Sequence, residues 1–462
     1  MTSARRLAPD PISAVARPVK RWPFAFGPRV FLLLCVGCVW LAPAWRDPRF
    51  LALMAAWDLL VLAAWAYDLR RLPPPERIEV ARAWPQAAAL DTEGSIDLRI
   101  RVHDPEPGLR LRARLVDDLP AALRRAPPLV ELLTGPGGAA AASYGIHPIE
   151  RGDFALGEIF LSYQGRLRLA ERWAAAGLHQ TVRVYPDIEQ SRRQTVYLIR
   201  SLQINQERRL RRKRGTGREF ESLREYRAGD QMRDICWTAS ARRAKMISKN
   251  HQVERSQAIW LVVDAGRLLR ARVAGLTKLD HAVNAALSLA QAALHSGDRV
   301  GLLAYGRRVQ QRLGAGRGAP HLRAMLECLA LVRAESAEAD HARAAGALLQ
   351  DQKHRSLVVW LTDLAETATM PEVIESAAAV SSRHLVLFVA IGQPELRGLV
   401  AQAPESTEQM YRYVSALDMI DRRELLLKSL RLRGVLAMEV HPGGLSAALV
   451  NRYLEIKERA LI

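Results

Sequence analysis

The fold of this chain is indicated most clearly by the sequence GTGREFESLREYRAGDQMRDICWTASAR, which occupies residues 215–242. This signature block places Arg, Glu and Asp among regularly placed aromatic residues, and it is followed by the apolar sequence AIWLVVD, which ends at Asp264. Arginine forks can form paired bonds to carboxylates, and aromatic rings can anchor a segment on a neighbouring core. The block therefore indicates a docking element laid against an α/β domain.

The chain after Gln257 alternates apolar runs with amphipathic segments. The apolar runs are typical of buried strands, and they cover residues 258–264, 299–305, 357–363, 384–391 and 435–440. Between them, residues 279–295 carry apolar side chains at helical spacing, and Ser296-Gly297 is a helix stop. Strands that alternate with helices predict a parallel sheet covered on both faces. We therefore expect a doubly wound α/β domain over residues 257–462.

Polar residues stand at the expected carboxyl ends of two of these strands. Asp264 ends the first strand, and Thr362 and Asp363 end another. Sheets of this class bind ligands outside the carboxyl ends of their strands, where the strand order reverses. If the two strands flank that reversal, Asp264, Thr362 and Asp363 share one crevice.

The segment over residues 78–187, which follows the Pro73-Pro74-Pro75 hinge, has a different pattern. Polar and apolar residues alternate in Ser95–Val102 and Leu109–Val116, as in strands with one buried face. Gly and Pro clusters separate these runs as loops, and Thr181–Tyr185 is the closing strand. We expect a β-sandwich here, and no catalytic constellation is visible in it.

Two apolar runs follow a basic tail over residues 1–29. Val30–Trp45 contains no charge, and Phe50–Tyr67 is interrupted only by Asp58. Each run is slightly shorter than the ~20 residues that span a bilayer, but interfacial Trp and flanking Arg extend the reach. Residues 30–69 therefore predict a two-helix membrane hairpin, in which Asp58 faces the other helix or lies near an end.

The basic residues around this hairpin predict its orientation. The link between the runs holds only Arg46 and Arg49, whereas Arg and Lys are more frequent on the outer flanks. The positive-inside rule then places both termini and the soluble domains on the cytoplasmic side of the membrane. A cleaved signal peptide is the alternative, because a basic lead precedes an apolar run. The second run, which an export signal would not need, argues against it.

Basic residues are concentrated in the linker and signature block, residues 190–256. Residues 190–255 hold 18 Lys or Arg and 7 Asp or Glu, in a chain of 462 residues with a net charge of +19. An anionic membrane surface or phosphate groups would suit this excess, and a solvated linker face is the alternative. Nucleic acid is less favoured, because no recognised nucleic-acid module is visible. The candidate contacts are Arg208, Arg209, Arg211, Arg212, Lys213 and Arg214.

The order of membrane hairpin, β segment, signature block and α/β domain resembles the bacterial family labelled domain of unknown function fifty-eight. Its most specific positions lie in the signature block: Gly217, Glu219, Phe220, Leu223, Arg224, Tyr226, Gly229, Asp230, Arg233, Trp237 and Arg242. In such proteins the α/β part is similar to a von Willebrand factor type A domain, and the resemblance implies a working partnership with MoxR-type AAA+ ATPases. From their chemistry alone, the same residues suggest a structural clamp between the sandwich and the α/β domain, or a partner-facing surface.

A von Willebrand factor type A domain usually holds a divalent ion such as Mg²⁺ through Asp-x-Ser-x-Ser, a Thr and a second Asp. This chain departs from that pattern, because Gly266 and Leu268 stand where the two Ser residues would be. The second loop, near residues 314–319, supplies no Thr. Asp264 with Thr362 and Asp363 is therefore a degenerate metal candidate. We expect a structural ion pair in place of a cofactor, with Arg267 as a candidate cation.

Enzyme chemistry finds little support, because the chain has no GxxxxGK[ST] phosphate loop, HExxH zinc helix or GxSxG elbow. We therefore expect a non-catalytic interaction module anchored in a bacterial inner membrane. The family resemblance implies that it serves a MoxR-type AAA+ ATPase in assembling or activating a client complex. One alternative is a Mg²⁺-dependent adhesion module that grips a partner's carboxylate. The other is a nucleic-acid binder that uses the basic stretch.

Overall fold

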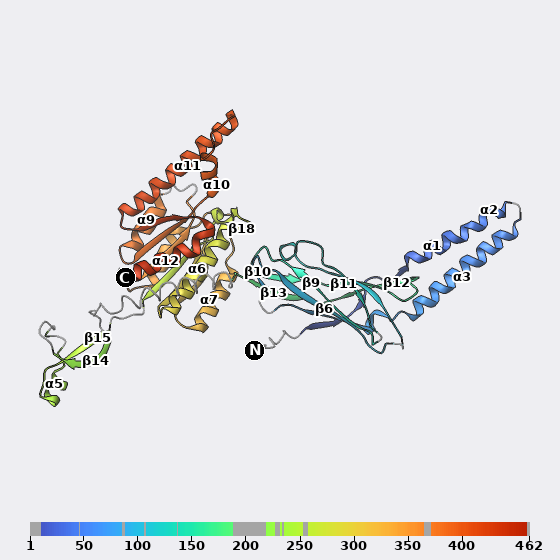
Figure 1. Ribbon diagram of the computed structural model, residues 1–462, viewed down its shortest axis with the longest axis horizontal. Coiled ribbons are helices and arrows are strands. Elements are labelled where there is room, and N and C mark those ends of the chain that lie inside the picture. The colour runs from blue at the N-terminus through green and yellow to red at the C-terminus, as the bar shows by residue number, and fades with distance from the viewer. Residues whose placement is uncertain are drawn as a thin grey trace. The chain divides into compact units, whose positions relative to one another are not determined.

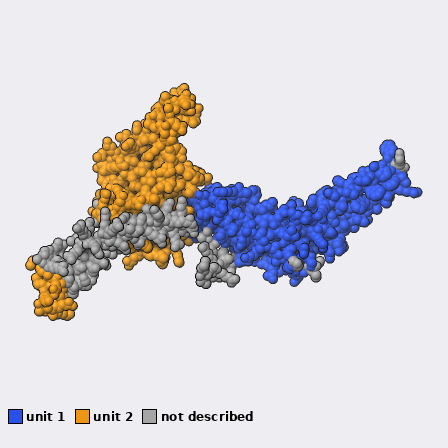
Figure 2. Space-filling model, viewed as in Figure 1, with its two compact units in different colours: residues 1–185 blue, residues 186–462 orange. Residues whose placement is uncertain are grey.

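The computed structural model describes residues 11–45, 47–85, 88–105, 108–135, 137–187, 219–226, 232, 235–252, 257–364 and 371–459. For residues 219–224 and 249–252 only the backbone is described. The chain divides into two compact units, residues 1–185 and 186–462, which Figure 2 colours separately.

The second unit contains a six-stranded sheet in the order β20-β19-β16-β21-β22-β23. These strands are β16 (Ala258–Asp264), β19 (Arg299–Tyr305), β20 (Val309–Gly316), β21 (Leu357–Thr362), β22 (Leu385–Ile391) and β23 (Leu436–Val440). Neighbouring strands are parallel except β19 and β20, which are antiparallel. Counted along the chain, the order is that of a doubly wound sheet, and its direction reverses between β16 and β21.

Helices cover both faces of this sheet (Figure 1). Side chains alternate across β16, so that Ile259, Leu261 and Val263 pack on one face and Trp260 and Val262 on the other. The first face is covered by α6 (Lys278–His295), α7 (Ala319–Leu331) and α12 (Leu445–Glu458). The second is covered by α8 (His341–Asp351), α9 (Pro371–Ser381) and α11 (Thr407–Leu432), and the short α10 (Pro394–Val400) contacts α11. The predicted α/β domain is therefore confirmed.

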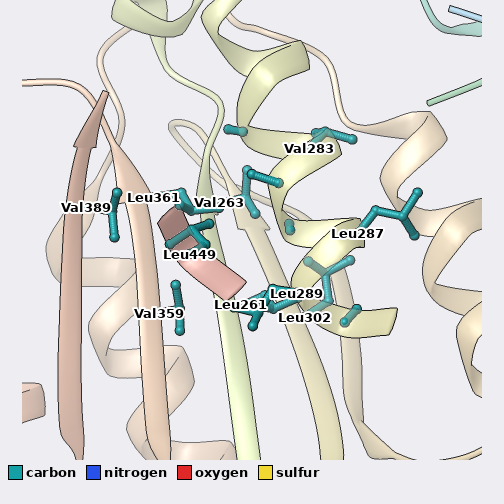
Figure 3. Close-up of a cluster of buried hydrophobic side chains, with 14 of the residues drawn as sticks. Leu261, Val263, Val283, Leu287, Leu289, Leu302, Val359, Leu361, Val389 and Leu449 are labelled. Carbon is teal, nitrogen blue, oxygen red and sulfur yellow. The ribbon is translucent and has the colours of Figure 1, made fainter. Parts of the chain in front are cut away.

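The packing of α6 shows how the sequence sets this core. In Figure 3, Val283 and Leu287 of α6 lie with Leu261 and Val263 of the sheet in one apolar cluster. Burial of each such side chain contributes about 1.5–3 kcal/mol. The helix begins where Thr277 and Asp280 form a capping box, a local signal that fixes its first turn.

The edge strand β20 was not predicted. Its sequence, VQQRLGAG, has no apolar run, because an edge strand is not enclosed on both faces, and most of its residues are partly or fully exposed. Gly314 to Gly316, which we expected in a loop at the ligand-binding edge, belong to this strand.

The first unit is built from sheets around one core, and their strands pair antiparallel except for β5 and β13, which pair parallel. Its strands are β1 (Ile12–Val15), β2 (Arg17–Pro18), β3 (Phe24–Phe26), β4 (Ile78–Ala83), β5 (Ala88–Ala89), β6 (Gly94–Val102), β7 (Arg112–Asp117), β8 (Leu129–Leu133), β9 (Ala139–Ile146), β10 (Gly152–Leu156), β11 (Ile159–Gln164), β12 (Ala170–Ala176) and β13 (Gln180–Tyr185). The sheet orders are β1-β4-β6-β9, β10-β13-β5 and β2-β12-β11-β7-β8, with β3 paired to β12. Alternate residues of β6, such as Ile96, Leu98 and Ile100, point into the core, as their period of two predicts.

The N-terminal segment differs from the expected basic tail. Residues 12–26 contribute β1, which pairs with β4, and β2 and β3, which pair with β12. These strands are short and mostly exposed, so they carry little of the apolar alternation that identifies a strand from sequence.

Two helical segments follow. The first comprises α1 (Pro28–Gly37), a short 3₁₀ turn and α2 (Leu41–Ala44), and the second is α3 (Arg49–Arg71). Trp57 of α3 donates a hydrogen bond from Nε1 to the Leu33 carbonyl of α1 over 2.9 Å. Asp58 lies beside Gly37 of α1, as expected for a polar residue that faces the other helix. By length and composition, the helical stretch Arg49–Arg77 is long and apolar enough to cross a membrane, whereas Pro28–Ala44 is shorter.

Candidate functional site

Asp264 and Thr362 meet at the carboxyl ends of β16 and β21, where the strand order reverses. The Thr362 hydroxyl donates a hydrogen bond to Asp264 Oδ2 over 2.6 Å. The Gly266 backbone N–H donates to Asp264 Oδ1 over 2.7 Å. The structure therefore brings Asp264, Thr362 and the adjacent Asp363 together at the strand reversal, where the strand ends predicted a shared crevice.

Two cations from distant parts of the chain meet at Asp363. Lys278 Nζ, from the first residue of α6, lies 2.5 Å from Asp363 Oδ2. Arg423 Nη2, from the middle of α11, bonds Asp363 Oδ1, which also accepts the Leu364 N–H over 2.7 Å. All three charged side chains are buried. An ion pair therefore occupies the carboxyl end of β21, and we call Lys278, Asp363 and Arg423 the ion triad.

Further bonds fix the arginine of the ion triad. Arg423 Nη2 donates to the Ile391 carbonyl at the end of β22 over 3.0 Å, and Nη1 lies 3.3 Å from Glu439 Oε1 of β23. Lys278 stands at a helix N-terminus, where the helix dipole disfavours a cation. Burial lowers the pKa of the Lys278 ammonium, and the Asp363 carboxylate opposes that shift. Lys278 therefore depends on Asp363 for its charged state.

A second buried network lies on the other side of Asp264. The Tyr305 hydroxyl is 2.8 Å from His341 Nδ1, and Trp360 Nε1 donates to the same hydroxyl over 2.6 Å. Burial raises the pKa of Asp264 and lowers that of His341, while attraction between the two charged forms opposes both shifts. Its side chains come from β19, β21 and α8, and all of them are buried.

The residues in this crevice do not fit the Mg²⁺ that the resemblance implies. Magnesium requires near-octahedral oxygen ligands. Both oxygens of Asp264 already accept hydrogen bonds, and both oxygens of Asp363 are bonded to cations. An added metal ion would meet two fixed positive charges at Asp363. Among the described residues, no group of three or more His, Cys, Asp or Glu side chains is arranged to hold a metal ion.

Sequence reasoning chose the wrong cation for this ion pair. Arg267 follows Asp264 closely, but its guanidinium lies 2.9 Å from Glu338 at the surface. Lys278 could have been suspected, because it directly follows the Thr277 cap and precedes the apolar stripe of α6. Arg423 carried no such signal, since it lies in a highly charged helix beside the exposed Arg422.

The signature block forms a small antiparallel unit of its own. Strand β14 (Glu219–Glu225) pairs with β15 (Ile247–Gln252), and α5 (Trp237–Arg243) lies between them in the chain. The Tyr226 N–H donates to the Met246 carbonyl over 2.8 Å. Trp237, which we expected to anchor the block on a core, is 65% exposed within the described part of the chain. The clamp and the partner-facing surface both stay predictions.

The predicted residues of the block are distributed as follows. Glu219, Phe220, Leu223 and Arg224 lie in β14, and Trp237 and Arg242 lie in α5. Several others lie outside the described residues, namely Gly217, Gly229, Asp230 and Arg233, as do the basic residues Arg208, Arg209, Arg211, Arg212, Lys213 and Arg214.

Comparison with known proteins finds a family model that matches part of the chain. Residues 222–409 match the family model described as Protein of unknown function DUF58. The resemblance to this family is confirmed over that span. The DUF58 match begins inside β14 and ends inside α11, so it joins the signature block to most of the α/β domain.

Several relatives and solved structures are similar to parts of the chain. Uncharacterized proteins from Mycobacterium bovis and Mycobacterium tuberculosis are 28% identical over 182 residues, which are 39% of this chain and 56% of theirs. The chain thus spans about half the length of the curated relatives that it matches. Among solved structures, the SpRpn10 VWA domain is 13% identical with a TM-score of 0.28, covering 43% of this chain and 95% of that one. The conserved hypothetical protein BatB from Bacteroides thetaiotaomicron is 13% identical with a TM-score of 0.31, covering 45% and 100%.

Proposed function

We propose that this chain is a membrane-anchored, non-catalytic protein-interaction module. It works with a MoxR-type AAA+ ATPase in the assembly or activation of a client protein complex. The α/β domain serves as a metal-independent binding domain, and its surfaces rather than a bound ion recognise the partner.

The observation that carries this proposal is the ion triad. The crevice at the strand reversal is where doubly wound sheets usually bind ligands. Here Lys278 and Arg423 supply fixed positive charge to Asp363, and Thr362 and Gly266 satisfy Asp264. With these groups buried and paired, the described crevice offers no free nucleophile or base to a substrate. This arrangement favours a structural role over catalysis and over Mg²⁺-dependent adhesion.

The membrane anchor is proposed as a two-pass hairpin with both soluble units in the cytoplasm. Support comes from the apolar helix Arg49–Arg77, the shorter helix Pro28–Ala44 that contacts it, and the basic residues on the outer flanks. A fluorescent protein fused after Ile462 should fluoresce, and alkaline phosphatase inserted after Asp47 should be active. Alkaline phosphatase activity from a fusion after Ile462 would contradict this topology.

The ATPase partnership is proposed from the DUF58 similarity, and it is tested by co-purification. Full-length tagged protein is isolated from native bacterial membranes in mild detergent, with ATP or with ADP. We expect a MoxR-type AAA+ ATPase to co-purify at a stoichiometric level. The amount of ATPase recovered should differ between ATP and ADP. Recovery of the tagged protein without such an ATPase under both conditions would overturn the partnership.

The alternatives have distinct outcomes. DNA retention that falls steeply with salt, and that is lost when Arg208 to Arg214 are neutralised, would favour the nucleic-acid binder. Saturable Mg²⁺ binding at Asp264 would favour the adhesion module.

A further inference from the structure

Three exposed arginines line an open pocket near the carboxyl end of β19. The pocket has a volume of about 500 Å³ and is lined by Arg307, Arg308, Glu335 and Arg343. Arg307 and Arg308 lie in the turn between β19 and β20, Arg343 lies in the first turn of α8, and Glu335 lies in the loop between α7 and α8. We call these four residues the arginine pocket.

The backbone around this pocket is held by hydrogen bonds. The Gly306 carbonyl accepts the Asp340 N–H over 3.0 Å, and the Gly306 N–H donates to the Arg308 carbonyl over 2.9 Å. The Glu335 N–H donates to the Ala265 carbonyl over 2.7 Å, which ties the loop to the end of β16. Because this backbone is already held, binding has to order the arginine side chains but not the loops that carry them.

Glu335 is the one carboxylate among the described lining residues, and uncharged donors fix it. Glu335 Oε2 accepts the Arg307 N–H over 2.8 Å, and Oε1 accepts Gln310 Nε2 over 2.8 Å. A side chain on Gly306 would overlap the Glu335 carboxyl group, so glycine is required for this close approach. Glu335 thus stands among the three arginines without an ion-pair contact to Arg307 or Arg308.

The guanidinium groups of the pocket remain available. In the part of the chain that the structure describes, Arg307 and Arg308 have no ion-pair partner, and Arg343 contacts only its own helix cap, Asp340, over 3.2 Å. When Asp340 is counted with the lining residues, three positive and two negative charges leave a net excess of one. Arg307 and Arg308 are the two lining arginines without an ion-pair partner among the described residues. Arginine forks match the geometry of carboxylates and bond them in pairs. Among the described residues, the pocket lining includes no aromatic side chain on which a nucleobase could stack.

We propose that the arginine pocket binds an acidic peptide segment of a partner protein through two neighbouring carboxylates. Two carboxylates match the two arginines without an ion-pair partner, Arg307 and Arg308, and the fixed Glu335 disfavours a denser anion such as a phosphate dianion. This inference rests on the proposed function and deepens it, because it gives the chemistry of the partner surface. In effect, exposed arginines recognise carboxylates at the same edge of the sheet where Lys278 and Arg423 neutralise Asp363 internally.

The test uses the full-length protein in nanodiscs of phosphatidylcholine, whose net charge is zero. Binding of a fluorescein-labelled hexaglutamate peptide is measured by fluorescence anisotropy at low and moderate salt. The double variant Arg307→Glu/Arg308→Glu should weaken the Kd for this peptide by about tenfold or more, because two attractive contacts become repulsive. Glu335→Gln should strengthen binding by about two- to threefold, since it removes a repulsive charge but keeps an acceptor for the Arg307 N–H.

A charge-matched control separates the pocket from the general basicity of the chain. Arg299 and Arg433 are exposed and lie just before or at the amino ends of β19 and β23, on the opposite edge of the sheet. The variant Arg299→Glu/Arg433→Glu should change the peptide Kd by less than about twofold. Equal weakening in both double variants would overturn the proposal, because it would reduce the binding to net charge.

The remaining outcomes are also decisive. A single-stranded oligothymidylate that binds more tightly than the peptide, and that needs the same arginines, would make this a nucleic-acid site and overturn the proposal. Each variant is used only if its thermal unfolding matches that of the parent protein. The peptide assay contains no ATPase, so it tests the arginine pocket independently of the ATPase partnership. Peptide binding at the pocket without ATPase capture contradicts the proposed partnership. ATPase capture without peptide binding at the pocket contradicts this inference.

Discussion

Replacing Lys278 by methionine tests the ion triad most sharply. The Lys278 side chain is 0% exposed, and its Nζ lies 2.5 Å from Asp363 Oδ2, whose side chain is 1% exposed. Methionine keeps an unbranched apolar stem that fills the same space, so the variant removes the charge with little loss of packing. The remaining partner of Asp363 is then Arg423, which is also bonded to Ile391 and Glu439.

The expected loss follows from the burial of this pair. Removing one partner of a buried ion pair costs about 3–5 kcal/mol, because the other charge stays buried. Since Arg423 still compensates Asp363, we expect the lower end, about 3 kcal/mol of unfolding free energy. For a domain of 150–250 residues each kcal/mol shifts the transition by about 2–4 °C, so Lys278→Met should lower it by roughly 6–12 °C.

Differential scanning calorimetry of the full-length protein measures this shift. Lys245→Met is the matched control, because Lys245 and Glu225 form an ion pair of 3.0 Å with side chains that are 69% and 70% exposed. Such an exposed pair contributes less than about 1 kcal/mol. In a double-mutant cycle, Lys278→Met with Asp363→Asn should lose less stability than the sum of the single changes. A Lys278→Met protein as stable as the parent would refute the assignment of the ion triad as a structural pair.

Three further predictions follow, two on the α/β domain and one on the contact between α3 and β12. Burial raises the pKa of Asp264 above its unfolded value of about 3.9, so between the two values the folded chain binds more protons; the parent protein should lose stability as pH rises through that window, and a similar loss in Asp264→Asn would contradict the cause. Thr362→Val removes the hydroxyl that donates to buried Asp264, so urea unfolding should show a loss of about 1–3 kcal/mol, whereas an unchanged midpoint would count against that bond. Asp68→Ala in α3 removes the acceptor of the Leu169 and Ala170 N–H groups, so hydrogen exchange at the start of β12 should accelerate, and unchanged protection there would show that Asp68 does not hold this junction.

The sequence predicted those parts of the fold whose signals are local. The strands of the α/β domain are apolar because both of their faces are covered, and α6 carries both an apolar stripe and a capping box. The meeting of Asp264 and Thr362 was predictable because parallel strands align their carboxyl ends. Edge strands lacked such signals: β20 is polar, and β1 to β3 are short and exposed.

The cations of the ion triad were not predictable because contact with Asp363 depends on tertiary placement. Lys278 precedes Asp363 by 85 positions, and Arg423 follows it by 60. Arg267 was favoured by its proximity to Asp264 in sequence, but the loop carries its side chain outward to Glu338. The arginine pocket has the same origin, because Glu335 reaches Arg307 and Gln310 through the fold rather than through sequence spacing.

Calorimetric titration of the full-length protein with Mg²⁺ and Mn²⁺ is the most direct test of a metal-independent α/β domain. With the ion triad in place, neither cation should give saturable heat, and the titration of the Asp264→Asn variant should look the same as that of the parent. Micromolar binding to the parent protein that disappears in Asp264→Asn would contradict the proposal, because it would show that this crevice holds a metal ion after all.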